Sequence, residues 1–199
     1  MEYRKKLEIC AVVIVIVTGI FSIQNYRKNK MIETTISNFD LNNIQNLASL
    51  SKIIDLVDFS TWIDMANNEY ASERWAGIYA LFELLKKDES LKGTLIPVFK
   101  QHKESEDDNI RMLAGAGLVH SGEKEGILVL ISCLESEEVV YFSQPPELLK
   151  EEARSYLKEY TDYDGINFKK WQNWWEDNQD KMFWNENKRS FELKKPKFW

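Results

Sequence analysis

The sequence predicts an all-α protein, an α-solenoid of about three helix pairs preceded by an N-terminal transmembrane helix. Apolar residues recur at helical spacing through residues 40–185, which we expect to form one repeat domain. Glycine and proline are scarce, 8 and 4 of 199 residues, and no two-residue hairpin turn separates alternating apolar runs, so a β-sandwich is disfavoured. A single uncharged apolar run near the N-terminus indicates a membrane segment.

Residues 1–30 are predicted to form a membrane anchor with basic flanks. Ile9–Ile23 is a run of fifteen residues without a charge. At about 1.5 Å per residue it measures roughly 22 Å, so neighbouring residues must help it to span a ~30 Å bilayer core. A cleaved signal peptide and a buried core helix are the alternatives. The lack of an Ala-x-Ala site weighs against cleavage, and the uniform apolarity weighs against a one-sided core helix.

The basic residues on either side of this run do not decide its orientation in the membrane. Three basic residues precede the run and three follow it, so the positive-inside count is a tie. A short basic tail ahead of an apolar run usually stays in the cytoplasm. We therefore expect a single-pass membrane protein whose soluble domain is extracytoplasmic.

Residues 31–39 are predicted to be a polar connector, and helices follow it with short turns between them. Capping residues and apolar spacing set the expected helix limits. The expected helices are one after Asp40 that carries Leu41 to Leu50, a short one after Ser60, one opened by Asn68 or Ser72 that carries Trp75 to Leu85, Leu95–Gln101 after Thr94, Asp108–His120, Glu125–Leu134, Pro146–Tyr160 and about Asn167–Phe183.

Three of these helices share a pattern. Arg74–Leu81, Arg111–Leu118 and Lys150–Leu157 begin 37 and 39 residues apart, and each has a basic residue first, a small residue three positions later and leucine seven positions later. A shorter apolar helix precedes the second and the third block. One helix pair cannot bury its own apolar face, so the pairs are expected to stack.

Two segments resemble known repeat proteins. Ile96-Pro97-Val98-Phe99, Asp108-Asn109-Ile110-Arg111 and Ala114–Leu118 together resemble the short HEAT-repeat pattern. The tail Tyr160–Gly165, followed by Phe168, Trp171, Trp174 and Trp175, is similar to the closing segment of many bacterial HEAT-repeat proteins. The resemblance covers roughly residues 70–185. It implies an α-solenoid that usually mediates protein interaction, and it implies no single activity.

The charge distribution argues against a nucleic-acid partner. Residues 1–30 carry six basic and two acidic residues, whereas residues 31–199 carry twenty basic and thirty acidic ones. An acidic soluble part lacks the clustered Lys and Arg on which phosphate binding depends.

Motifs for catalysis or cofactor binding are weak. Gly117–Gly122 begins like a phosphate loop, but the required Lys-Ser/Thr pair does not follow. His102 and His120 are the only histidines, each near a predicted helix end, and Cys133 has no histidine nearby in sequence. The sequence therefore predicts no enzyme, no catalytic residue, no metal site and no cofactor.

The tryptophans near the C-terminus are the most distinctive chemical feature. Trp171, Trp174 and Trp175 are candidates for a partner-binding surface, and an aromatic cap over the last helix pair is the favoured alternative. Residues 186–199 form a basic and aromatic tail, which we expect to be loosely packed.

Together these features predict a membrane-anchored, non-enzymatic HEAT-repeat scaffold or adaptor for protein–protein interaction. Its protein partner is not identified by the residues, and Ile9–Ile23 would provide the membrane contact. The alternatives are an accessory, lyase-like or chaperone-like HEAT protein that binds a small molecule, and a surface protein that binds glycans through exposed tryptophans.

Overall fold

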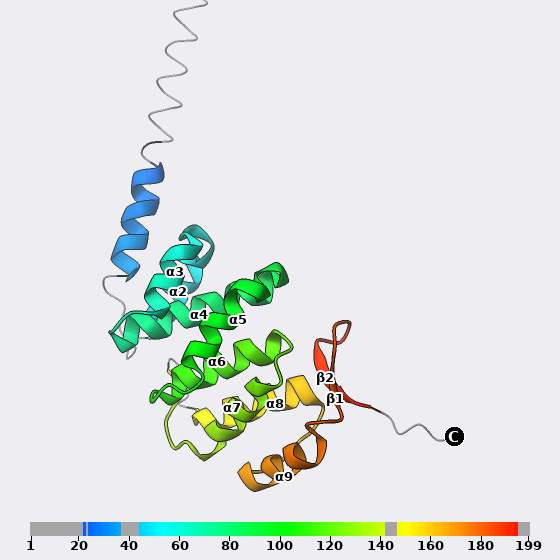
Figure 1. Ribbon diagram of the computed structural model, residues 1–199. Coiled ribbons are helices and arrows are strands. Elements are labelled where there is room, and N and C mark those ends of the chain that lie inside the picture. Colours follow the sequence, from blue (N-terminus) through cyan, green and yellow to red (C-terminus); the bar gives the residue numbers. More distant parts are fainter. Residues whose placement is uncertain (1–21, 23, 37–43, 142–146, 195–199) are drawn as a thin grey trace, which may run out of the picture. The chain divides into compact units, whose positions relative to one another are not determined.

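A computed structural model describes residues 22, 24–36, 44–141 and 147–194 (Figure 1). The chain divides into two compact units, residues 1–39 and residues 40–199. In the first unit residues 24–36 are helical, so most of the predicted connector is helical up to residue 36. Among the described residues, no helix combines the length and apolar character needed to cross a membrane. The predicted anchor Ile9–Ile23 lies outside the described residues, except for Ser22.

The second unit is mostly helical, as predicted. Helix α6 has the predicted limits, and the other helices differ from their predicted limits by a few residues at one or both ends. The elements are α2 (Ile44–Ile53), η1 (Ile54–Leu56), α3 (Phe59–Ala66), α4 (Ala71–Lys87), η2 (Glu89–Leu91), α5 (Lys92–His102), α6 (Asp108–His120), α7 (Glu125–Ser132), η3 (Cys133–Glu135), α8 (Leu149–Thr161), α9 (Phe168–Asn178), β1 (Met182–Asn185) and β2 (Ser190–Leu193).

The start of α5 corrects one prediction. The Asp88 side chain accepts a hydrogen bond from the backbone N–H of Ser90 at 3.0 Å, and η2 then leads directly into α5 at Lys92. The helix therefore begins ahead of Thr94, the predicted cap. Pro97 lies well inside the helix rather than in its first turn, so it removes one internal hydrogen bond.

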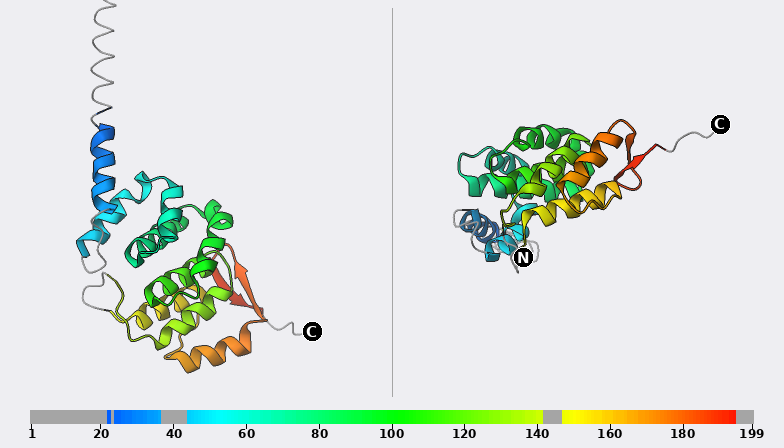
Figure 2. Two further views of the ribbon diagram at one scale, coloured as in Figure 1. Left: turned by 60° about the vertical axis from the view of Figure 1, so that its left-hand side comes forward. Right: turned by 90° about the horizontal axis from the view of Figure 1, so that it is seen from below.

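The helices follow one another from α2 at one end of this unit to α9 at the other (Figures 1 and 2). Helix α3 packs on α4, α5 on α6, and α7 on α8, which gives three successive helix pairs. The second helices of the pairs also touch, since α6 contacts both α4 and α8. Helix α6 is thus the shared neighbour of all three pairs.

The sequence of α6 explains its central position. The Asp107 side chain caps its N-terminus by accepting a hydrogen bond from the N–H of Ile110 at 3.1 Å. Eleven of its thirteen residues are buried, and its middle consists of small residues, Ala114–Gly117. Small side chains on several faces of one helix allow several neighbours to approach its backbone.

Two glycine contacts fix how closely the helices pack. A Cβ atom at Gly126 of α7 would lie 2.6 Å from the carbonyl oxygen of Gly115 in α6, and one at Gly77 of α4 would lie 2.3 Å from the backbone nitrogen of Ala66 in α3. Both contacts are to backbone atoms, which cannot rotate away. The α3–α4 and α6–α7 contacts therefore require glycine.

The C-terminal part departs from the sequence prediction. The sequence predicts a last helix that runs to Phe183, but α9 ends at Asn178, and a turn with a 2.9 Å bond from Lys181 N–H to the Asn178 carbonyl leads into a β-hairpin. The strands pair antiparallel, with Met182 opposite Leu193. Phe191 is only 2% exposed, so the prediction of a loosely packed tail is wrong for β2, whereas residues 186–189 are an exposed turn. Residues 195–199 lie outside the described residues.

The hairpin is held by long-range packing. Trp184 packs edge-on to Phe191, with ring centroids 5.0 Å apart. Trp184 also covers Gly122, whose positive φ of 84° ends α6 in a tight turn. Strand β2 contacts α8 as well. The two strands are too short to be stable in isolation, and they form here because the helices supply an apolar surface.

Substitution of Gly77 tests the close α3–α4 contact. Gly77→Ala is expected to lower the free energy of unfolding by about 1–3 kcal/mol, because the new Cβ meets backbone that must shift. Urea unfolding followed by circular dichroism measures this change.

Gly93→Ala is the matched control, since a Cβ atom at this α5 glycine would meet nothing within 4 Å and alanine favours helix. It should leave stability unchanged or raise it by about 0.5–1 kcal/mol. Equal losses from the two substitutions would contradict the packing argument.

Candidate functional site

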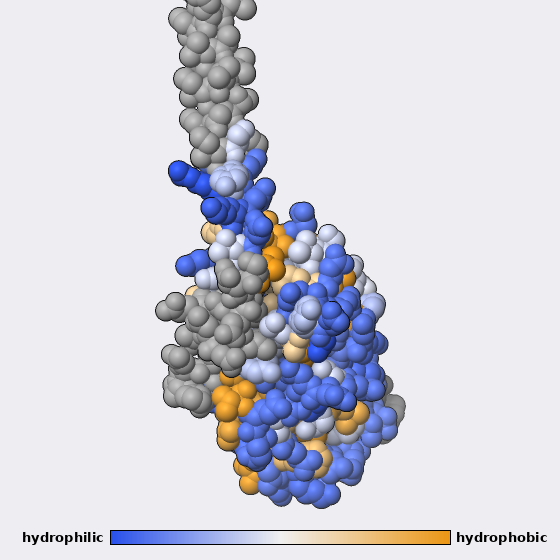
Figure 3. Space-filling view, turned by 90° about the vertical axis from the view of Figure 1, so that its left-hand side faces the viewer, coloured by the Kyte–Doolittle hydropathy of each residue, from blue (hydrophilic) through white to orange (hydrophobic). Residues whose placement is uncertain are grey.

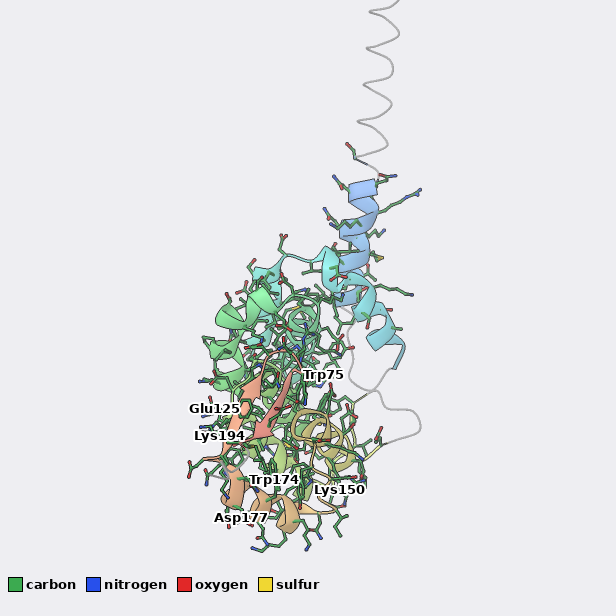
Figure 4. The ribbon with its side chains drawn as sticks, turned by 90° about the vertical axis from the view of Figure 1, so that its right-hand side faces the viewer. Trp75, Glu125, Lys150, Trp174, Asp177 and Lys194 are labelled. Atoms are coloured by element: carbon green, nitrogen blue, oxygen red, sulfur yellow. The ribbon has the colours of Figure 1, made fainter. Side chains whose placement is uncertain are left out.

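Three pockets lined by described residues are candidates for a functional site. Their volumes are about 250 Å³ beside Trp75, about 300 Å³ beside Lys150 and about 480 Å³ beside Trp174. Figure 4 shows Trp75 apart from the other two residues. Of these three regions, the sequence indicates only the third, through its tryptophans.

The first of these, which we name the aromatic pocket, is built from three helices and the segment that precedes α8. It combines four aromatic rings with two carboxylates, and among the described residues no Lys, Arg or His lines it. Its lining residues are Trp75 and Tyr79 of α4, Asn109, Met112 and Leu113 of α6, Val140, Tyr141 and Glu147 of the segment before α8, and Glu152 and Tyr156 of α8.

The aromatic rings are arranged as a wall. Trp75 and Tyr79 are one helical turn apart on α4, and their rings stack with centroids 5.0 Å apart and an interplanar angle of 6°. Tyr141 meets Trp75 edge-on at 6.0 Å. Trp75 is 4% exposed, whereas Tyr79, Tyr141 and Tyr156 are half-buried and keep part of their surface open to the pocket.

Asn109 positions the segment that carries Tyr141. Its side-chain oxygen accepts a hydrogen bond from the Tyr141 N–H at 3.0 Å, and its amide donates to the carbonyl of Val139 at 3.1 Å. The Tyr141 hydroxyl donates to Asp107 at 3.1 Å. Asn109 is 1% exposed, so these bonds satisfy a polar side chain that would otherwise be costly to bury. The buried asparagine thus connects the first turn of α6 to the aromatic pocket.

The carboxylates give the aromatic pocket a negative charge. Burial raises the pKa of Glu152, and the neighbouring Glu147 carboxylate raises it further, while a hydrogen bond from Tyr156 and the charge of Lys86 oppose this. Burial and the nearby Glu152 in turn raise the pKa of Tyr156, so its hydroxyl stays protonated and donates to that carboxylate. Within the described parts of the chain, no Lys or Arg forms an ion pair with Glu152.

The pocket beside Lys150 is less suited to bind a charged ligand than the aromatic pocket is. Its cations are already neutralised, since Lys150 pairs with Glu137 at 2.9 Å and Arg154 pairs with Glu151 at 2.5 Å. The remaining lining is Leu134 of η3, the α8–α9 connection and the start of α9. An anion would have to displace these pairs in order to bind.

The three tryptophans of α9, which the sequence suggests as a binding surface, lie in different environments. Trp171 is fully buried and donates from its indole nitrogen to the carbonyl of Gly165 at 2.9 Å, and Trp175 is 8% exposed. Trp174 is half-buried and stacks on Tyr163 with centroids 5.0 Å apart. Trp171 and Trp175 are therefore core residues, whereas Trp174 lines one of the three pockets described above, which it shares with the hairpin.

The two histidines lie where the sequence predicts them, at the last positions of α5 and α6. Both are 7% exposed, and burial lowers the pKa of each, so both are neutral near pH 7. His120 Nδ1 lies 2.9 Å from the Tyr160 hydroxyl. Neither histidine lines any of the three pockets.

The described residues include no group of three or more His, Cys, Asp or Glu side chains that could hold a metal ion. Cys133 is buried, and burial raises the pKa of its thiol to about 11, so it is protonated and unreactive at neutral pH.

Comparison with protein-family models, curated proteins and solved structures finds no match to this chain. The resemblance to HEAT repeats stays a prediction from the residues. The aromatic pocket was missed at the sequence level because its residues come from segments up to about eighty positions apart. The one available signal was Asn109, a polar residue between the apolar positions of a predicted helix.

The tryptophans of α9 allow a test of their different roles. Trp171→Ala should lower the free energy of unfolding by about 3–5 kcal/mol, because it removes a fully buried ring. Trp174→Ala should cost less than half as much, since this ring is partly exposed. Urea unfolding followed by circular dichroism compares the two, and equal losses would show that Trp174 is also a core residue.

Proposed function

We propose that this protein is a membrane-anchored, non-enzymatic scaffold of the HEAT-repeat type that binds a protein partner on the face where α4, α6 and α8 meet. The observation that carries the proposal is the aromatic pocket, which takes residues from the second helix of each of three successive pairs. Repeat proteins commonly bind partners on a surface that their stacked helices share.

The size and surroundings of the aromatic pocket favour an interaction role. At about 250 Å³ it is smaller than most drug-sized ligand sites, and it suits a single side chain of a partner. Figure 3 shows one face of the molecule, on which hydrophilic residues predominate and hydrophobic residues form small separate groups. On this face a partner would meet separate apolar groups rather than one broad apolar surface.

One observation supports the alternative function, glycan binding through exposed aromatic rings. Trp174 and Tyr163 present stacked, half-buried rings to a pocket of about 480 Å³ that also contains Asp162 and Glu192. Flat aromatic faces with neighbouring carboxylates are a surface to which a sugar could bind. The burial of Trp171 and Trp175 removes two of the three rings on which this alternative is based.

The membrane part of the proposal has its own test. We expect the chain to occur in the membrane fraction at its full-length mass, with a C-terminal tag that external protease digests in intact cells. A soluble form lacking about the first 19–22 residues would show that Ile9–Ile23 is a cleaved signal. A full-length membrane form with a protected tag would instead place the domain in the cytoplasm.

Photo-crosslinking in intact cells tests the partner-binding face. A benzophenone-bearing phenylalanine at Tyr79 or at Tyr141 should form a covalent adduct with one and the same protein, because both side chains line the aromatic pocket. The control is the same residue at Phe183, an exposed aromatic position on β1 outside that pocket. Adducts with unrelated proteins, or equal yields at the control position, would contradict the proposal.

A further inference from the structure

We propose that the aromatic pocket binds a single cationic side chain, Lys or Arg, from a basic segment of the partner protein. This inference rests on the proposed scaffold function and adds the chemistry of the partner. It follows from the ring geometry, the placement of the carboxylates and the acidic surface that continues beyond the pocket.

The rings provide the first element of recognition. The stacked Trp75–Tyr79 pair and the edge-on Tyr141 line one cavity, with Tyr156 contributed by α8. An ammonium or guanidinium group is attracted to the faces of aromatic rings. The half-buried rings of Tyr79, Tyr141 and Tyr156 would make this contact, because Trp75 is only 4% exposed. The methylene chain of Lys or Arg would at the same time fill the apolar part of the cavity beside Met112 and Leu113.

The carboxylates provide the second element. Glu147 and Glu152 reach the same small cavity from two different segments, and their like charges disfavour each other. A neutral or anionic occupant would leave this repulsion in place, whereas a cation would remove it. Burial raises the pKa of Glu152, and the charges of Glu147 and Glu159 raise it further, so a cation in the pocket would favour its ionised form.

Lys86, the cation whose charge lowers the pKa of Glu152, is committed elsewhere. Lys86 pairs with Glu83 at 2.8 Å, and its ammonium lies 5.3 Å from the centroid of the Phe82 ring. Its charge lowers the pKa of Glu152, but this effect is smaller than that of burial and that of the Tyr156 hydrogen bond. The aromatic pocket is therefore not satisfied by this lysine.

The acidic surroundings point to a protein segment rather than a small amine. Asp107 accepts the hydrogen bond of the Tyr141 hydroxyl, and Glu138 lies beside Asn109, with its carboxylate 3.5 Å from the Asn109 amide. Burial raises the pKa of Glu138, and the charges of Asp108 and Asp107 raise it further, so carboxylates crowd this edge too. Arg111, which pairs with Asp108, opposes this shift and neutralises part of the charge. A segment with several basic residues could place one in the pocket and others against this edge.

Peptide titration of the full-length chain in a maltoside detergent tests the inference. The probes are a short peptide with three consecutive lysines, its arginine counterpart and its norleucine counterpart, which keeps the apolar chain without the charge. We expect the two basic peptides to bind at least about tenfold more tightly than the norleucine peptide, with a ratio that falls as salt rises.

Paired substitutions on α8 separate the pocket from general charge attraction. Glu152→Gln should weaken the binding of basic peptides at least about fivefold and leave norleucine binding unchanged, because it removes one of the two pocket carboxylates. Glu159→Gln is the matched control, an exposed carboxylate on the same helix that does not line the pocket and whose charge raises the pKa of Glu152 less than that of Glu147 does. It should change binding less than about twofold, as expected of a screened surface charge.

Thermal unfolding checks that the Glu152→Gln variant is folded and gives an independent readout. A carboxyl whose pKa is raised in the folded state costs stability when it is ionised, so the variant should melt at a higher temperature than the parent at pH 7.5. The difference should shrink as the pH falls and Glu152 is protonated in the parent. A structural role alone would predict lower stability.

The outcomes separate the inference from the scaffold proposal. If Tyr79 and Tyr141 crosslink one partner but basic peptides bind no better than norleucine, the scaffold stands and the cation inference is wrong. Tighter binding of choline or ethanolamine than of the lysine peptide would assign the aromatic pocket to a lipid headgroup and overturn the inference. If the Glu152 and Glu159 variants lose equal affinity for the basic peptides, the binding reflects the overall acidity of the surface. That result would also overturn the inference.

Discussion

The backbone contact between α6 and α7 is the constraint on which the rest of this unit depends. With glycine at both Gly115 and Gly126, the two helices approach until a single Cβ would strike a carbonyl oxygen at 2.6 Å. Helix α6 in turn contacts α4, α5 and α8, so its position fixes the spacing of all three pairs. Overpacking at such a contact displaces whole helices, and the aromatic pocket, lined by α4, α6 and α8, would open or close with them.

One buried polar residue connects this packing to the candidate site. Asn109 lies in the first turn of α6 beside the cap formed by Asp107, and it bonds to the backbone on both sides of Val140. The same turn of α6 therefore begins the helix, orients Tyr141 and supplies Asp107 as the acceptor for the Tyr141 hydroxyl. Buried polar networks that are fully bonded specify one arrangement of a loop, where apolar contacts alone would permit several.

Local signals explain which parts of the fold the sequence predicts. The limits of α6 are predicted correctly because Asp107 provides a cap, the apolar spacing is regular and Gly122 ends the helix with a positive φ. The hairpin was missed because its strands have four residues each and are stabilised by contacts such as Trp184 on Gly122, which no local pattern records. The aromatic pocket was missed for the same reason.

The tryptophans of α9 stand out by composition, and composition does not distinguish a core ring from an exposed one.

The aromatic pocket also differs energetically from the core around it. The core places apolar rings such as Trp62 and Trp171 at no exposure and satisfies each of these two indole nitrogens with a backbone carbonyl. The pocket instead holds a carboxyl group, Glu152, in surroundings that raise its pKa and so disfavour its ionised form. Folding alone would favour a neutral side chain at that position. A group that is unfavourable for stability and faces an aromatic cavity is better explained by what it binds, since a cationic ligand converts the same buried charge from a cost into an attraction.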